Sequence, residues 1–240
     1  MRAAPAAPRR FAGFSRESLE LLRQLEANNC QTWFDAHRQL LRELLVEPAI
    51  DLVIEIGPLL RERVAPGLRA EPRIGGSILR MRHDARYRRA GPYRTHVELW
   101  FWEGRGPSHQ HPGFYVRLAA DELVLGTGIT LFPPALLLRY REQVDRPGPG
   151  RELVALLRQL EASGVRVGGQ HLRRTPRPFP ADHERAALLK QVGLRADRAE
   201  PLPGTMPEAV LGPILPELLV SGFVRLEPLR RWLLRLESVP

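Results

Sequence analysis

Residues 95–129 of the chain read THVELWFWEGRGPSHQHPGFYVRLAADELVLGTGI and contain three stretches rich in β-branched, aromatic and aliphatic side chains. The three stretches are Thr95–Trp102, Phe114–Ala119 and Glu122–Ile129, and each has the composition of a β-strand. Ala120-Asp121 can form a turn between the last two. Neighbouring strands joined by short links pair in the antiparallel sense. The sequence therefore predicts an antiparallel meander near the middle of the chain.

Helical periodicity is found on both sides of these strands. Ser15 can cap a helix that carries Leu19, Leu22 and Leu25 on one face and ends at Asn28-Asn29. A second helix follows, with Thr32 and Asp35 spaced as in a capping box. A third opens at Pro48, and Pro58 is expected to kink or end it. Further helices are predicted over 133–144, 151–163, 182–192, 211–220 and 229–236, short strands over 77–81 and 165–168, and a break at Pro147–Gly150.

Helices that flank a mainly antiparallel sheet define the α+β class. The chain has 240 residues, 43% hydrophobic and 26% charged, which is enough for one sizeable core. We therefore predict a single α+β domain over residues 11–240. Residues 1–10, rich in Ala, Pro and Arg without an apolar segment, are predicted to be a flexible tail.

Charge and cysteine content restrict the class of protein. The formal net charge is +9, and the cations are 35 arginines and Lys190. A single cysteine, Cys30, excludes an intramolecular disulfide and favours a cytoplasmic protein. No apolar run approaches the length of a membrane span, so no membrane partner is predicted. Nothing in the sequence decides the oligomeric state.

Arginine is concentrated in residues 80–94, which read RMRHDARYRRAGPYR. Six arginines and one carboxylate give this segment a net charge of +5. In an extended chain alternate side chains share a face, so arginines can form a cationic stripe that binds phosphate or carboxylate through bidentate contacts. The predicted anion-binding residues are Arg80, Arg82, Arg86 and Arg94. The rival interpretation is an internal arginine–carboxylate network that fixes the segment before the sheet.

Three residues of the same region are candidates for catalysis: Asp84, Tyr93 and His96. His96, like His83, could transfer protons near neutral pH. The cations beside Asp84 favour its charged form, which makes it a poor acid and favours a role as an anchor for Arg80 or Arg86.

Other motifs have mainly structural interpretations. His109 and His111 could face a metal, but no third ligand stands at a recognisable spacing, so no metal or cofactor is predicted. Trp100 and Trp102 could stack on bases, although aromatic residues in strands are usually core. Gly126-x-Gly128 lacks the helix of a dinucleotide site and favours a tight or bulged backbone.

Several motifs together resemble the uncharacterised bacterial and fungal family known as domain of unknown function 2461. They are Phe11–Ser15, Asn28-Asn29, Trp33–Arg38, Pro48, the arginine-rich segment, Pro92–His96, Gly113–Val116, Gly126–Gly128 and Leu189-Lys190. Against the family signature, Arg80, Asp84 and Arg86 match directly and Tyr87 replaces a Phe. His83 replaces the second Arg, and Arg89–Gly91 replaces an expected Asp-Lys. The resemblance implies a fold and candidate residues without a chemistry.

The prediction of function is a protein with an arginine-rich anion-binding cleft, built from Arg80, Arg86, Tyr93 and His96, that is either a binding protein or an enzyme on a phosphorylated or acidic substrate. Alternatives are a non-catalytic nucleic-acid or protein-interaction module and a purely structural motif. A concave pocket would favour the small anion, whereas a flat surface continuous with Arg173, Arg174 and Arg177 would favour nucleic acid.

Overall fold

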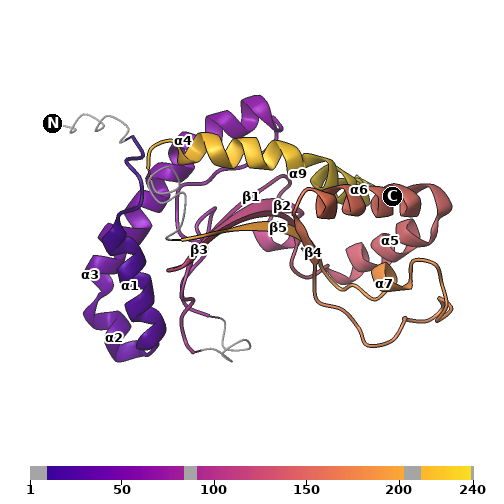
Figure 1. Ribbon diagram of the computed structural model, residues 1–240, viewed down its shortest axis with the longest axis horizontal. Helices are drawn as coiled ribbons and strands as arrows, with labels where there is room; N and C mark the ends of the chain where they lie inside the picture. The colour runs from indigo at the N-terminus through magenta and orange to yellow at the C-terminus, as the bar shows by residue number, and fades with distance from the viewer. Residues whose placement is uncertain (1–9, 84–90, 203–211, 239–240) are drawn as a thin grey trace. The chain divides into compact units, whose positions relative to one another are not determined.

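The computed structural model describes residues 10–83, 91–202 and 212–238. In chain order the elements are α1 (Arg16–Ala27), α2 (Gln31–Ala36), α3 (Arg38–Leu41), the π-helical turn η1 (Arg42–Val46), α4 (Glu47–Arg63), β1 (Val97–Trp102), the 3₁₀ turn η3 (Ser108–Gln110), β2 (Gly113–Leu118), β3 (Glu122–Ile129), α5 (Pro134–Asp145), α6 (Pro147–Ala162), β4 (Arg166–Gly168), α7 (Ala186–Leu189), β5 (Leu194–Pro201) and α9 (Leu215–Ser238). Figure 1 shows their arrangement.

The strands form one antiparallel sheet in the order β1-β2-β3-β5-β4. Strands β1, β2 and β3 are the three predicted for the meander, and β5 joins β3 to the edge strand β4. Helices flank the sheet, so the predicted α+β class is confirmed. Residues 1–9 of the predicted tail lie outside the described residues, and the domain boundaries stay a prediction.

The chain divides into two compact units, and both include parts of the sheet. Unit 1 comprises residues 1–100, 116–123 and 200–221, and unit 2 comprises residues 101–115, 124–199 and 222–240.

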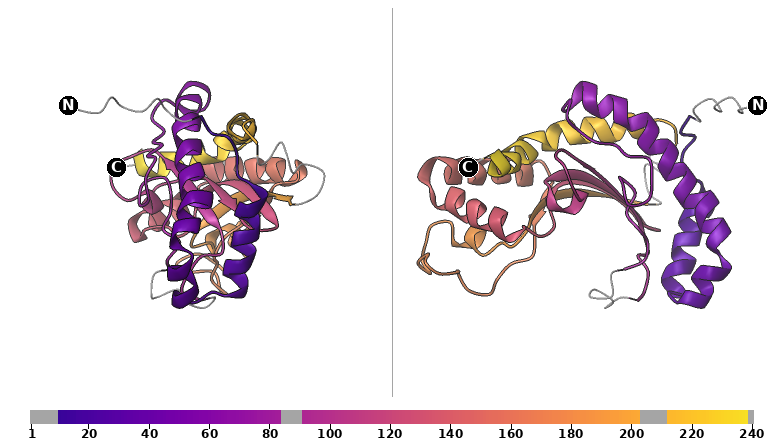
Figure 2. Two further views of the ribbon diagram at one scale, coloured as in Figure 1. Left: turned by 90° about the vertical axis from the view of Figure 1, so that its left-hand side faces the viewer. Right: turned by 180° about the vertical axis from the view of Figure 1, so that it is seen from behind.

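Unit 1 contains α1 to α4, and Figure 2 shows α1 lying alongside α2 and α3. Helix α1 begins as predicted, because the Ser15 hydroxyl accepts from the Ser18 amide at 3.2 Å and the Ser18 hydroxyl accepts from the Ser15 amide at 3.1 Å. The Ser18 hydroxyl also donates to the Leu44 carbonyl at 2.7 Å, which fixes α1 against η1. Leu22 and Leu25 are fully buried below this contact.

Unit 2 has an aromatic core on one face of the sheet. Phe114 stacks on Phe223 of α9 with ring centroids 4.6 Å apart, and Phe101 meets the same ring edge-on at 6.2 Å. Helices α5, α6 and α7 form a second cluster in this unit (Figure 1). There Tyr140 is fully buried, and burial raises the pKa of its hydroxyl.

Some predicted elements are wrong in detail. Residues 77–81 are not a strand, although Ile78 forms isolated bridges with Ile74 and Leu99, and the helix predicted over 182–192 shortens to α7. Helix α2 is capped by Cys30 without a side-chain bond, so the predicted capping box is absent. Pro58 lies inside α4 without ending it, and the two predicted C-terminal pieces are one helix, α9, with Pro228 inside it.

Candidate functional site

The two ends of the arginine-rich segment pair with each other in unit 1. The His83 amide donates to the Pro92 carbonyl at 2.9 Å, and the Arg94 amide donates to the Met81 carbonyl at 2.6 Å. Arg82 and Tyr93 form the antiparallel bridge between these bonds. Because residues directly opposite each other share a face, Arg82 and Tyr93 lie on one side of this ladder, and Arg94 lies on the other.

Asn29 holds the second strand of this ladder. Its side-chain amide donates to the Tyr93 carbonyl at 2.8 Å, and its side-chain oxygen accepts from the Tyr93 amide at 3.0 Å. Phe34 stacks on the Tyr93 ring at 3.8 Å between centroids. Gly91 has φ +103, and a Cβ there would overlap the Asn29 side chain. Asn29 and Phe34 thus fix the position of Tyr93.

A pocket of about 870 Å³ lies beside this ladder, wholly within unit 1, and we call it the Arg80 pocket. Its lining is Gln31, Phe34, Asp35, Arg38, Leu41, Arg42, Val46, Glu47, Ile50, Asp51, Pro72, Arg73, Ile74, Arg80, Met81, Arg82 and Tyr93. Among the described residues of the lining, five arginines and three carboxylates give a net formal charge of +2. Much of the rest is aliphatic or aromatic.

The five arginines differ in their partners. Arg38 donates to Asp35 at 2.6 Å, Arg42 lies 3.5 Å from Glu47, and Arg73 donates to Glu71 at 2.6 Å. The Arg38 bond lowers the pKa of Asp35, and the nearby charge of Arg82 lowers it further. Within the described part of the chain, neither Arg80 nor Arg82 has an ion-pair partner. Among the described residues, no ion pair neutralises these two charges.

Arg94 and His96 belong to a second cluster, around the buried carboxylate of Glu98. The Arg94 Nη1 atom lies 3.0 Å from Glu98 Oε2, His96 Nε2 lies 3.6 Å from the same oxygen, and Arg117 Nη2 lies 3.6 Å from Oε1. Burial by itself would raise the pKa of Glu98, but His96 and the two guanidinium groups outweigh it and lower the pKa to about 2. Glu98 is therefore a permanent anion at neutral pH.

His83 is next to this cluster. Burial lowers the pKa of its imidazole, and the electrostatic influence of Arg94 and of the His96 ring lowers it further. His83 is thus neutral at physiological pH.

The structure separates the residues that the sequence grouped. Arg80, Arg82 and Tyr93 line the Arg80 pocket, whereas Arg94 and His96 face Glu98. Asp84 and Arg86 lie outside the described residues, so their roles stay predictions. Glu98 was missed, although a single carboxylate within the otherwise apolar run Val97–Trp102 is a signal of a buried ion pair.

The other motifs have structural surroundings. Trp100 and Trp102 are 4% and 3% exposed, which confirms the core interpretation. His111 Nδ1 lies 2.9 Å from Glu237 and Nε2 lies 2.8 Å from the Arg105 carbonyl. A Cβ at Gly128, which has φ +138, would overlap the Leu194 carbonyl. Across residues 10–83, 91–202 and 212–238, no three His, Cys, Asp or Glu side chains form a metal-ligand group.

Comparison with known proteins gives a family. The model of the family described as "Conserved hypothetical protein (DUF2461)" matches residues 17–232. The chain belongs to this family. No curated protein matches the chain. Of the helices in the described part of the chain, none is both long and apolar enough to cross a membrane.

Proposed function

We propose that unit 1 binds a small organic oxyanion, a phosphate or carboxylate joined to an apolar body, in the Arg80 pocket. The observation that carries the proposal is the placement of Arg80 and Arg82 beside an apolar lining, without ion-pair partners among the described residues. A planar guanidinium group binds phosphate or carboxylate through two parallel hydrogen bonds.

The apolar part of the lining decides what kind of anion the pocket suits. It comes from α2 to α4 and the ladder, and its members are Phe34, Leu41, Val46, Ile50, Ile74, Met81 and Tyr93. Burying apolar ligand surface against such side chains contributes about 25 cal/mol per Å². An inorganic anion leaves that contribution unused. We therefore expect an aromatic phosphate to bind more tightly than inorganic phosphate.

The proposal concerns binding, and it limits the residues that catalysis could use. His96 faces Glu98, so among the described catalytic candidates Tyr93 alone lines the pocket. Among the described residues, acid–base chemistry on a bound ligand would depend on Tyr93 and on the carboxylates of the lining, Asp35, Glu47 and Asp51.

Isothermal titration with phenyl phosphate, inorganic phosphate and phenol tests the proposal. We expect phenyl phosphate to bind best and Arg82→Gln to weaken its affinity at least about tenfold, since a charge-assisted contact is lost. Arg80→Gln should act similarly. Arg61→Gln, which removes an exposed arginine of α4 outside the pocket lining, is the matched control.

Equal affinity in wild type, Arg80→Gln and Arg82→Gln would refute the proposal, as would equal affinity for phenyl phosphate and inorganic phosphate. Thermal unfolding of each variant, measured alongside, shows whether a loss of affinity comes from a loss of fold.

A further inference from the structure

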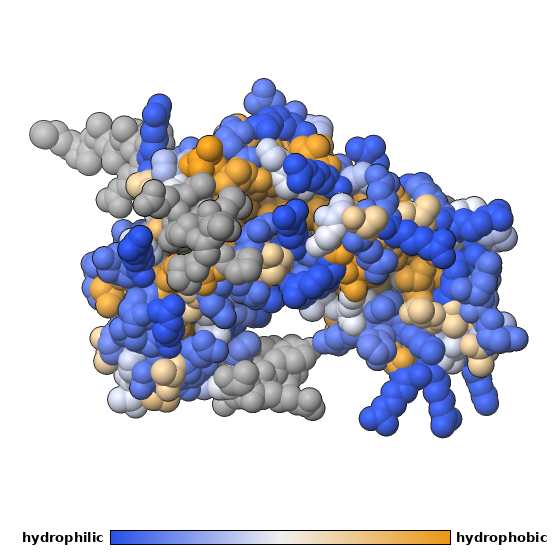
Figure 3. All heavy atoms as spheres, in the orientation of Figure 1, coloured by the Kyte–Doolittle hydropathy of each residue, from blue (hydrophilic) through white to orange (hydrophobic). Residues whose placement is uncertain are grey.

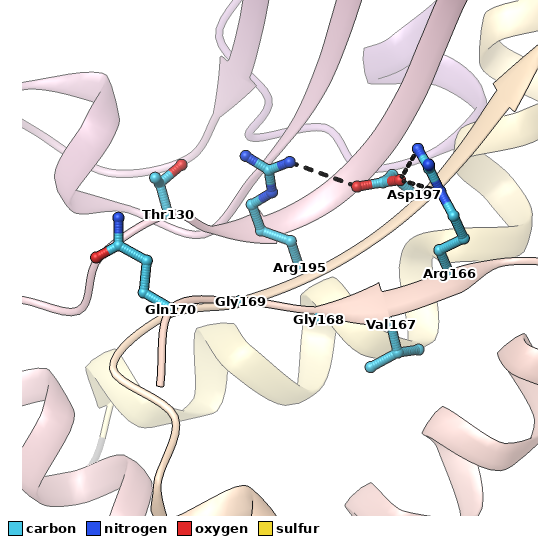
Figure 4. A pocket seen from close by; sticks show the side chains of 8 residues that line it. All are labelled: Thr130, Arg166, Val167, Gly168, Gly169, Gln170, Arg195 and Asp197. Atoms are coloured by element: carbon cyan, nitrogen blue, oxygen red, sulfur yellow. Dashed lines mark hydrogen bonds and ion pairs between the residues drawn. The ribbon is translucent and has the colours of Figure 1, made fainter. Parts of the chain in front are cut away.

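Unit 2 has a polar hollow of its own, of about 440 Å³, on strands β4 and β5. Its lining residues are Thr130, Arg166, Val167, Gly168, Gly169, Gln170, Arg195 and Asp197. Figure 4 shows Arg195 between two groups, with Asp197 and Arg166 on one side and Thr130 and Gln170 on the other. We call this the Arg195 hollow.

The pairing of β4 with β5 explains why these side chains meet. Arg166 lies opposite Asp197 and Gly168 lies opposite Arg195 in the antiparallel register. Residues opposite each other share a face, and so do residues two apart along a strand. One face of the two strands therefore carries Arg166, Arg195 and Asp197. A side chain at position 168, which glycine lacks, would lie on the same face.

Arg195 is held in place by its neighbours. Its guanidinium lies 5.0 Å from the centroid of the buried Tyr115 ring, and its Nη2 atom lies 3.5 Å from Asp197 Oδ2. Asp197 is fixed in turn, because it accepts from the Tyr115 hydroxyl at 2.8 Å and from Arg166 Nη2 at 2.8 Å. A cation that is already positioned loses less side-chain entropy when it binds an anion.

The charge balance leaves room for an anion. Two arginines and one carboxylate give the hollow a net formal charge of +1. Asp197 is mainly engaged by Arg166 and Tyr115, and its contact with Arg195 is long at 3.5 Å. Arg195 has five N–H donors, and one long contact uses only a small part of them.

Gly168 gives an independent indication of a ligand. Glycine weakens a strand, and in a strand it often marks a place that a ligand or another backbone approaches closely. At Gly169 and Gly193 the fold itself explains the glycine, because a Cβ would overlap the carbonyls of Gly193 and Thr130 respectively. At Gly168 a Cβ would meet nothing within 4 Å, and the backbone does not have a positive φ. The fold does not require this glycine, and its missing side chain keeps the hollow open beside Arg195.

We propose that the Arg195 hollow binds the oxyanion group of a small hydroxylated ligand, a sugar phosphate or a sugar acid. Arg195 binds the oxyanion, while the Thr130 hydroxyl and the Gln170 amide contact the hydroxyl groups. Arg166, Asp197 and Tyr115 are positioning residues that hold Arg195. Among the described residues of the lining, Val167 is the only bulky apolar side chain, which separates this ligand class from that of the Arg80 pocket.

The test is titration of the full chain with glucose 6-phosphate, gluconate, inorganic phosphate and sorbitol, followed by calorimetry. We expect binding of glucose 6-phosphate or gluconate and none of sorbitol. The stronger of the two identifies the oxyanion. Arg195→Gln should weaken binding at least about tenfold. The control Arg158→Gln, which removes an exposed charge from α6, should leave it unchanged.

Gly168→Val separates loss of the site from loss of the fold. Valine favours strands and has space at this position, so we expect unfolding at the wild-type temperature or above together with loss of binding. Arg82→Gln in unit 1 should leave this binding unchanged, so the two proposed sites fail or succeed separately. No binding at millimolar concentration, equal binding of sorbitol, or full binding by Gly168→Val and Arg195→Gln would overturn the inference.

Discussion

At the scale of single residues, Glu98 is a buried carboxylate held by three neighbouring side chains. Its side chain is 7% exposed, and taking a carboxylate out of water is costly unless cations and hydrogen bonds offset the loss of hydration. Arg94 and His96 provide that compensation from the segment that leads into β1, and Arg117 provides it from β2. The cluster is thus a structural link between these segments of unit 1.

Glu98→Gln should destabilise the protein strongly, because it leaves two partly buried guanidinium groups without their counter-charge. Breaking such a pair typically costs about 3 kcal/mol or more. Urea unfolding should show a lower midpoint with an unchanged slope. The matched control is Glu20→Gln, which removes an exposed ion pair with Arg23 and should cost less than about 0.5 kcal/mol. Equal midpoints for Glu98→Gln and wild type would contradict the structural role.

The same residue predicts how stability depends on pH. The pKa of Glu98 falls from 4.5 to about 2 on folding, so the folded state favours its ionised form. This stabilisation is fully present above pH 4.5 and is lost as the pH falls from 4.5 towards about 2. Burial lowers the pKa of His83 below its ordinary value of 6.5, so protonation of His83 favours the unfolded state. This loss of stability also occurs as the pH falls, and it begins at a higher pH than the loss that Glu98 causes. Unfolding free energies below pH 4.5 should therefore fall more steeply for wild type than for Glu98→Gln.

At the scale of elements, the junction of α5 and α6 shows how packing overrides local sequence. Pro147-Gly148-Pro149-Gly150 reads as a chain break, yet it forms the first turn of α6, where proline is accepted. Arg185 donates to the Val144 carbonyl at 2.6 Å and to the Asp145 carbonyl at 2.8 Å at the end of α5. Gly150 is buried against Val144 and Arg185, so α6 can begin directly after α5.

Two glycines of this turn give a matched pair of substitutions. A Cβ at Gly150 would overlap the Val144 carbonyl, so Gly150→Ala should destabilise the protein by about 1–3 kcal/mol. A Cβ at Gly148 would meet nothing within 4 Å, so Gly148→Ala should stabilise it by about 0.4–1 kcal/mol through loss of unfolded-state freedom. Opposite shifts of the melting temperature are expected. Shifts of the same sign would show that α6 does not begin as described.

The sequence predicts β1, β2 and β3 because their residues favour strands, but it does not predict β5. Residues 194–201 read LRADRAEP, which has little β-propensity, and Asp197 is buried there only because Arg166 and Tyr115 are its partners. Such a strand is defined by its neighbours, which lie far away in the sequence. The helix predicted over 182–192 fails for a related reason, since only residues 186–189 are helical and the chain then turns into β5.

The site was predictable only in part, for a geometric reason. Alternation placed Arg80 and Arg82 on one face, and both line one pocket, as does Met81 between them. Arg94 was grouped with them by its charge, but it lies across the ladder from Met81 and faces Glu98. Sequence spacing within the segment could not show which face each strand of the ladder presents.

At the scale of the whole molecule, the net charge of +9 raises the question of nucleic acid. Arg173, Arg174 and Arg177 are exposed in the segment between β4 and α7, and hydrophilic side chains project from that segment in Figure 3. They belong to unit 2, whereas Arg80 and Arg82 belong to unit 1. Trp100 and Trp102 are buried, so the aromatic side chains proposed for base stacking are inaccessible to bases.

These observations predict that any nucleic-acid binding is electrostatic and indifferent to strandedness. Preference for single strands comes from bases stacked on aromatic rings, and each stack contributes about 1–3 kcal/mol. Without Trp100 and Trp102, random single-stranded and duplex oligonucleotides of equal charge should bind within about tenfold of each other, with affinities that fall steeply with salt. Fluorescence anisotropy across a salt series measures both quantities. A weak salt dependence together with a strong preference for single strands would contradict this prediction and show that the protein contacts bases. Arg82→Gln would then show whether that binding depends on the Arg80 pocket, since the variant should weaken small-anion binding there.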